Sequence, residues 1–91
     1  MSVSELFEPV WKRICEHEGS FFETEGGRWF TYRVDGDALV PSHSDVRIPR
    51  ADLEIAFPML PVPAPKLNKH VRGPAFVWAV LHDPRISEGR W

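Results

Sequence analysis

The sequence predicts an α+β fold, with an N-terminal helix, a three-stranded antiparallel meander and one or two short C-terminal helices packed on one sheet face. Near the N-terminus, apolar residues recur every three to four positions, as on one face of a helix. Two glycine turns then separate short segments rich in aromatic and β-branched residues, which is typical of hairpins. A chain of 91 residues builds one core, so residues 1–91 form a single domain.

The first element is a helix over residues 4–17. Leu6, Val10 and Ile14 form its apolar stripe, and serines near the start are suited to cap it. Because of Pro9, the sequence allows two starting points for this helix. The helix either begins early and lacks one backbone hydrogen bond at Pro9, or begins late with Pro9 in its first turn.

Three strands follow the helix, over residues 20–24, 28–34 and 38–41. The sequences Glu-Gly-Gly and Asp-Gly-Asp stand between them, and both are typical of tight turns. We therefore expect consecutive antiparallel strands that form a meander.

The register of the first hairpin follows from the side chains that it places on each face. A three-residue loop with Gly27 in the left-handed conformation sets Phe22 opposite Phe30 and Glu23 opposite Trp29. A two-residue turn would instead place an acid on the apolar face, so the first register is favoured. The core face of this register consists of Phe22, Phe30, Tyr32 and Val34.

The second half of the chain alternates between short helices and loops. Residues 41–49 form a loop, and residues 50–57 form a helix that Pro58 ends. Residues 57–74 are rich in proline and predict an extended crossing segment. Residues 74–82 suit a helix or a buried strand, and the Gly-Pro dipeptide at their start favours the helix.

Composition places the chain among ordinary globular proteins. The net charge of −2 does not point to a polyanion partner for the whole molecule, although residues 66–72 are locally basic. Cys15 is the only cysteine, so an intramolecular disulfide is excluded. No signal peptide is visible, and the longest apolar run, residues 75–81, is too short to span a bilayer. We expect a cytoplasmic protein without membrane contact.

No constellation of catalytic residues is evident, and we expect a protein that is not an enzyme. Cys15 and His17 stand two positions apart on a helix, which turns their side chains to different sides. Asp35 and Asp37 flank a glycine, as residues of a tight turn do. We expect no catalytic residue, no cofactor and no metal site.

Binding is the activity that the sequence supports best. The leading hypothesis is protein association, as a homodimer or with a protein partner, because Trp and Arg are favoured at interfaces. The alternative is nucleic-acid binding by a basic and aromatic sheet face together with the 66–72 loop. The candidate partner-binding residues are Trp29, Arg33, Arg47, Arg50, Lys66, Lys69 and Arg72.

Overall fold

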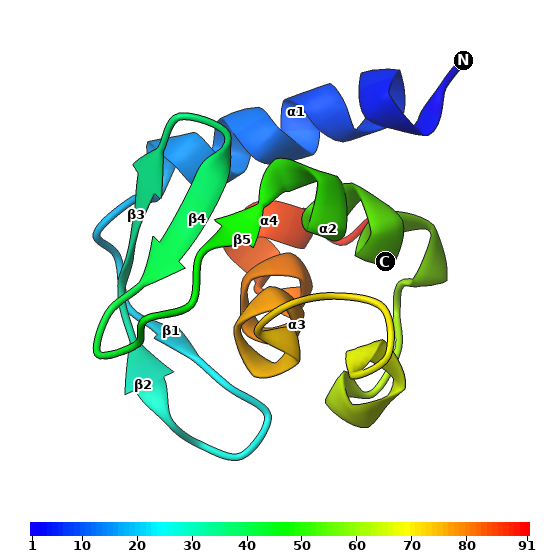
Figure 1. Cartoon of the computed structure of the whole chain (residues 1–91). Helices are drawn as coiled ribbons and strands as arrows, with labels where there is room; N and C mark the ends of the chain where they lie inside the picture. The colour runs from blue at the N-terminus through cyan, green and yellow to red at the C-terminus, as the bar shows by residue number, and fades with distance from the viewer.

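The computed structural model describes residues 1–91 and has the α+β fold that the sequence predicts (Figure 1). The elements, with η for 3₁₀ helices, are α1 (Val3–Glu16), β1 (Phe22–Glu23), β2 (Trp29–Phe30), β3 (Tyr32–Asp35), β4 (Ala38–Pro41), β5 (Ile48–Pro49), α2 (Arg50–Ala56), η1 (Phe57–Met59), η2 (Ala64–Leu67), α3 (Pro74–His82) and α4 (Pro84–Ser87).

Helix α1 begins early and runs through Pro9. Ser2 is its N-cap, and the Ser2 hydroxyl oxygen accepts a hydrogen bond from the backbone N–H of Glu5 at 3.2 Å. The late start at Pro9 does not occur. The buried stripe of the helix differs from the expected one, because Leu6 is 48% exposed and the buried residues are Phe7, Val10, Trp11 and Ile14. Packing of these residues against the other helices stabilises the helix across the proline.

The first hairpin has the expected register. Phe22 pairs with Phe30 and Glu23 with Trp29, and Gly27 adopts a left-handed φ of 89°. The predicted strand 28–34 is divided, however. It breaks at its middle residue into β2, which pairs with β1, and β3, which pairs with β4.

The three-stranded antiparallel sheet has the order β3-β4-β5. Its third strand, β5, falls in the segment that we expected to be a loop, and it pairs Ile48 with Leu39. A strand of two residues is too short to show an alternation of apolar and polar side chains, and one of the two is Pro49, so the sequence does not indicate a strand here.

The C-terminal half contains more helix than expected. Residues 74–82 form helix α3, as the Gly-Pro start predicts. The proline segment is not simply extended, because it contains η1 and η2. A fourth helix follows α3 directly: Asp83 ends α3 and caps α4 through its side chain, which accepts the N–H of Arg85.

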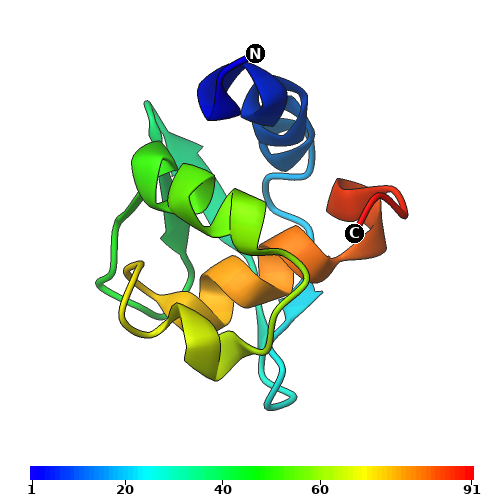
Figure 2. The same ribbon diagram turned by 90° about the vertical axis from the view of Figure 1, so that its right-hand side faces the viewer.

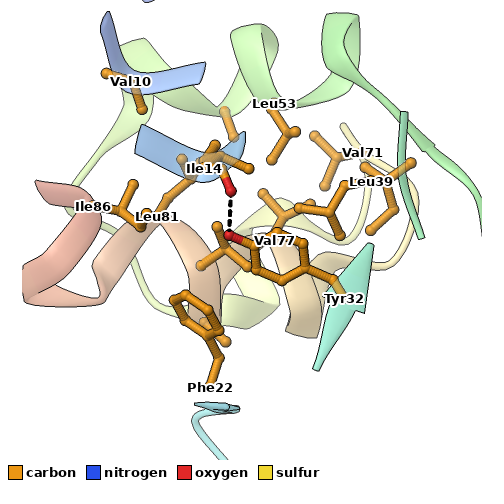
Figure 3. Close-up of a cluster of buried hydrophobic side chains, with 14 of the residues drawn as sticks. Val10, Ile14, Phe22, Tyr32, Leu39, Leu53, Val71, Val77, Leu81 and Ile86 are labelled. Carbon is orange, nitrogen blue, oxygen red and sulfur yellow. Dashed lines mark hydrogen bonds between the residues drawn. The ribbon is translucent and has the colours of Figure 1, made fainter. Parts of the chain in front are cut away.

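One hydrophobic core lies between the strands and the helices (Figure 3). Phe22 points into it from β1, and the Tyr32 hydroxyl donates a 2.7 Å hydrogen bond to the carbonyl of Ile14 on α1. Burial raises the pKa of Tyr32 well above its ordinary value. This bond joins the sheet to the first helix.

Helices α2 and α3 lie to one side of the strands, and in the turned view they lie in front of them (Figures 1 and 2). Helix α3 passes through the middle of the molecule beside the β1–β2 ribbon, and α1 crosses above it (Figures 1 and 2). No helix has the length and apolar character needed to cross a membrane.

Candidate functional site

The outer face of the β1–β2 ribbon carries two large aromatic side chains that are exposed to solvent. Trp29 is 62% exposed and Phe21 is 65% exposed. Glu23 pairs with Trp29, and strand alternation places Phe21 on the same side as Glu23. Phe22 and Phe30 face the opposite way and are buried. We refer to Phe21, Glu23 and Trp29 as the aromatic face.

A groove of about 270 Å³ lies between this face and the end of helix α3. We call it the tryptophan groove, and its lining residues are Glu23, Trp29, Trp78, Ala79, His82, Asp83, Pro84 and Arg85. The ribbon supplies one wall and the turn from α3 to α4 supplies the other. The groove therefore brings two tryptophans from distant parts of the sequence to one place.

Trp78 is held in position by His82, one turn further along α3. The two rings stack with centroids 4.9 Å apart and an angle of 19° between their planes. His82 Nδ1 lies 2.9 Å from the carbonyl oxygen of Trp78, and Nε2 accepts the N–H of Val62 at 3.2 Å. Only the neutral tautomer with its proton on Nδ1 satisfies both bonds. These contacts fix the His82 ring as a support for the Trp78 ring.

Asp83 and Arg85 neutralise each other within the groove. Arg85 Nε and Nη2 donate to the two carboxylate oxygens of Asp83 at 2.8 and 2.9 Å. Burial raises the pKa of Asp83, but the hydrogen bonds from the side chain and backbone of Arg85 outweigh it, and the net pKa is lowered. Arg85 also donates to the carbonyl of Phe21 at 2.6 Å and lies over the ring of Phe22, 4.2 Å from its centroid.

Glu23 is the remaining charged group of the groove. It is exposed and takes part in no ion pair. Because Asp83 and Arg85 form a closed pair and both ring nitrogens of His82 have partners within the chain, the carboxylate of Glu23 is the one unpaired charged group of the tryptophan groove. That charge stands directly across the ribbon from Trp29.

Arg33 and Arg47 are both exposed, and both approach Asp35. Arg47 Nη1 lies 2.8 Å from the carboxylate of Asp35, and Arg33 Nη1 lies 3.8 Å from it. The hydrogen bond from Arg47 holds the pKa of Asp35 below its usual range. Arg33 borders a separate hollow at the β3–β4 pair, so the structure does not bring it together with Trp29 in one groove.

Arg50 lies at the start of α2, where we considered anion contact, but acids of its own chain surround it. Its guanidinium contacts Glu8 at 2.8 Å and Glu54 at 3.0 Å, and its side chain is only 19% exposed. The hydrogen bond that Arg50 donates to Glu8 raises the pKa of Arg50, and burial partly opposes this increase. Arg50 joins α1 to α2 and offers no free charge to a partner.

Lys66, Lys69 and Arg72 lie in and after η2, and all three are exposed without an ion-pair partner. The backbone N–H of Arg72 donates to Asp52 at 2.8 Å, which anchors the segment while leaving its side chain free. A groove of about 480 Å³ separates η2 from the tip of the first hairpin, where Arg28 lines it.

Cys15 is half-buried on α1 as a free thiol. Burial, followed by the nearby carboxylate of Glu18, raises the pKa of the Cys15 thiol, which keeps it protonated at neutral pH. No three His, Cys, Asp or Glu side chains gather closely enough to hold a metal ion.

Among the residues that line the tryptophan groove, only Trp29 was a candidate from the sequence; Glu23, Trp78 and the residues of the α3–α4 turn were missed, as was Phe21 at the rim. Two adjacent phenylalanines in a strand must point to opposite faces, so Phe21 was predictable as the outward one once Phe22 was assigned to the core. Trp78 and His82, four positions apart, form a stripe on α3. No sequence signal indicates that this stripe meets Trp29.

Comparison of the chain with protein-family models, with curated proteins and with solved structures finds no match in any of the three.

Proposed function

We propose that this chain is a protein-association module that binds its partner on the aromatic face and in the tryptophan groove beside it. The observation that carries the proposal is the exposure of Phe21 and Trp29 on one face, with no segment of the chain covering either. Large aromatic side chains are enriched at the centres of protein interfaces, where a few of them supply most of the binding free energy.

The charge at this face favours a protein over a nucleic acid. The carboxylate of Glu23, directly across from Trp29, would repel phosphates. Arg33, Arg47 and Arg50, the cations nearest in sequence that we considered as phosphate contacts, approach acids of the same chain. Arg28, the neighbour of Trp29, lines the groove beside η2 instead, so a base in the tryptophan groove would meet the carboxylate of Glu23 and no unpaired cation.

The outer edges of the three-stranded sheet offer few backbone groups to a partner strand, which favours docking through side chains. On the outer edge of β3, the carbonyl of Tyr32 accepts the N–H of Gly19 at 2.9 Å, and the N–H of Val34 donates to Glu18 at 2.6 Å. The edge strand β5 contains Pro49, which has no N–H to donate. The two outer edges of the three-stranded sheet are therefore poorly suited to pair with a partner strand.

Selection of binders from a library of short random peptides tests the proposal. Peptides selected on the wild-type chain should lose affinity by roughly tenfold or more on Trp29→Ala, because truncating a central aromatic anchor costs at least about 1.4 kcal/mol, which is a factor of ten. Fluorescence anisotropy measures the affinity. Ile55→Ala, which removes an exposed apolar side chain on α2, is the matched control and should leave binding unchanged.

Sedimentation equilibrium examines a second copy of the chain as the partner. A mass that rises with concentration in the wild type and not in Trp29→Ala supports the proposal and identifies a homodimer. A monomer that also yields no Trp29-dependent peptide overturns the proposal.

The second candidate function is nucleic-acid binding by the 66–72 loop. It is favoured by one observation, that Lys66, Lys69 and Arg72 are exposed and lack acidic partners. The site differs from the one that the sequence suggested, because Trp29 and the arginines of the sheet take no part in it.

This second candidate predicts binding of a mixed oligonucleotide pool that weakens steeply with salt. Replacing both Lys66 and Lys69 by Ala should lower the salt dependence, with the slope of log affinity against log salt falling by about 2. A filter-binding titration at several salt concentrations measures the slope. Binding that is absent, or that does not respond to salt, eliminates this candidate.

A further inference from the structure

The tryptophan groove has the dimensions of a site for one side chain. Its volume of about 270 Å³ falls below the range of roughly 300–1,000 Å³ that is typical of small-molecule pockets. Trp29 and Trp78 both line it, together with Glu23, which stands opposite Trp29 on the neighbouring strand. A recess lined by two indoles and one unpaired carboxylate complements a flat cation.

The charged groups of the groove also limit which type of side chain it would bind. Asp83 is closed by Arg85, and both ring nitrogens of His82 are occupied within the chain, so Glu23 alone is available to a ligand. A single carboxylate beside two indoles suits a guanidinium, which stacks on aromatic faces and donates two parallel hydrogen bonds to a carboxylate.

Beside the groove, the chain already contains a guanidinium that stacks on an aromatic ring and pairs with a carboxylate, and that ring belongs to Phe22, the residue before Glu23. Arg85 lies 4.2 Å from the centroid of the Phe22 ring, donates two hydrogen bonds to the carboxylate of Asp83, and donates a further one to a backbone carbonyl. The elements that hold Arg85 are also the elements that line the groove. The chain thus contains, beside the groove, one guanidinium held against an aromatic ring and paired with a carboxylate.

We propose that the tryptophan groove binds an arginine side chain of the partner protein, with the guanidinium against Trp29 and Trp78 and paired with the carboxylate of Glu23. This inference rests on the proposed function and names the chemistry of its partner. Arginine fits better than lysine, because the ammonium of lysine has no flat face to stack and no fork to match a carboxylate.

The probe is a blocked glycine peptide with one central arginine, titrated into the wild-type chain and followed by the indole N–H resonances of Trp29 and Trp78. Both resonances should shift and saturate together. The same peptide with citrulline, which has the shape of arginine without its charge, should bind about tenfold more weakly or worse. A lysine peptide should fall between the two.

Glu23→Gln tests the carboxylate while keeping the size of the side chain. We expect the affinity for the arginine peptide to fall by about fivefold to tenfold, and the affinity for the citrulline peptide to stay the same. Glu25→Gln is the matched control, since it removes an equal charge from the same hairpin at a residue that does not line the groove. It should leave both affinities unchanged.

The outcomes separate this inference from the proposed function. Equal binding of arginine and citrulline peptides, or no effect of Glu23→Gln on the arginine peptide, overturns the inference. If the selected library peptides depend on Trp29 but carry no arginine, the inference fails while the association function stands. If no peptide depends on Trp29, the proposed function itself fails.

Discussion

Phe22→Ala should lower the free energy of unfolding by about 3–5 kcal/mol, which is a large part of the total of about 5–15 kcal/mol for a domain of this kind. The Phe22 side chain is fully buried. Its ring packs against the rings of Phe30 and Tyr32, with centroids 6.2 and 5.2 Å away, and under the guanidinium of Arg85. The substitution opens a cavity and removes the ring on which Arg85 stacks, so we expect the upper part of the range. Urea unfolding followed by circular dichroism measures it.

The adjacent phenylalanine provides the control. Phe21 is 65% exposed, so Phe21→Ala should change the free energy of unfolding by only about 0.5 kcal/mol or less. The two variants remove the same side chain at successive positions. If both destabilise the chain equally, the assignment of one phenylalanine to the core and the other to the binding face is wrong. Should Phe22→Ala fail to fold, Phe22→Leu provides a smaller and measurable loss.

Gly73→Ala should destabilise the chain by about 2 kcal/mol or more, through two separate effects. Gly73 has a left-handed φ of 52°, where an alanine costs roughly 1–2 kcal/mol. A Cβ at this position would also lie 2.9 Å from Cδ1 of Ile48 and 3.3 Å from Cδ2 of Phe76. Ile48 is fully buried, so its side chain has little room to move, and overpacking adds roughly 1–3 kcal/mol.

Gly36→Ala separates the backbone effect from the packing effect. Gly36 has a similar φ of 61°, but nothing lies within 4 Å of a Cβ placed there. This variant should lose only the backbone contribution, and thermal unfolding of both variants gives the difference. Equal losses at Gly73 and Gly36 would mean that the contact with Ile48 adds nothing to the cost.

The sequence predicts correctly those elements that are determined by neighbouring residues. The register of the first hairpin followed from the need to keep Glu23 off the apolar face, and helix α3 followed from its Gly-Pro start. Strand β5 and helix α4 were missed. The strand has two residues and thus no period, and the Asp-Pro dipeptide that indicates the end of α3 serves at the same time as the start of α4.

The candidate site was less predictable, because charge pairing depends on residues that are distant in sequence. Arg50 and Glu8 are 42 positions apart, and Arg47 and Asp35 are 12 apart. The Arg50–Glu54 pair has the i,i+4 spacing of a local helix pair, but no pattern within either segment indicates the contacts of Arg50 with Glu8 and of Arg47 with Asp35. Trp29 was predictable as an outward residue, whereas its position beside Trp78 depends on how α3 packs against the ribbon.

The affinity ratio between wild type and Trp29→Ala for a selected peptide tests the central claim most directly, with the free energy of unfolding of both chains measured in parallel. The aromatic face as a docking surface predicts a loss of affinity of roughly tenfold or more, while the free energy of unfolding changes by about 0.5 kcal/mol or less because Trp29 is largely exposed. Equal affinity for the two chains, or a loss of affinity that only follows a loss of stability, would contradict it.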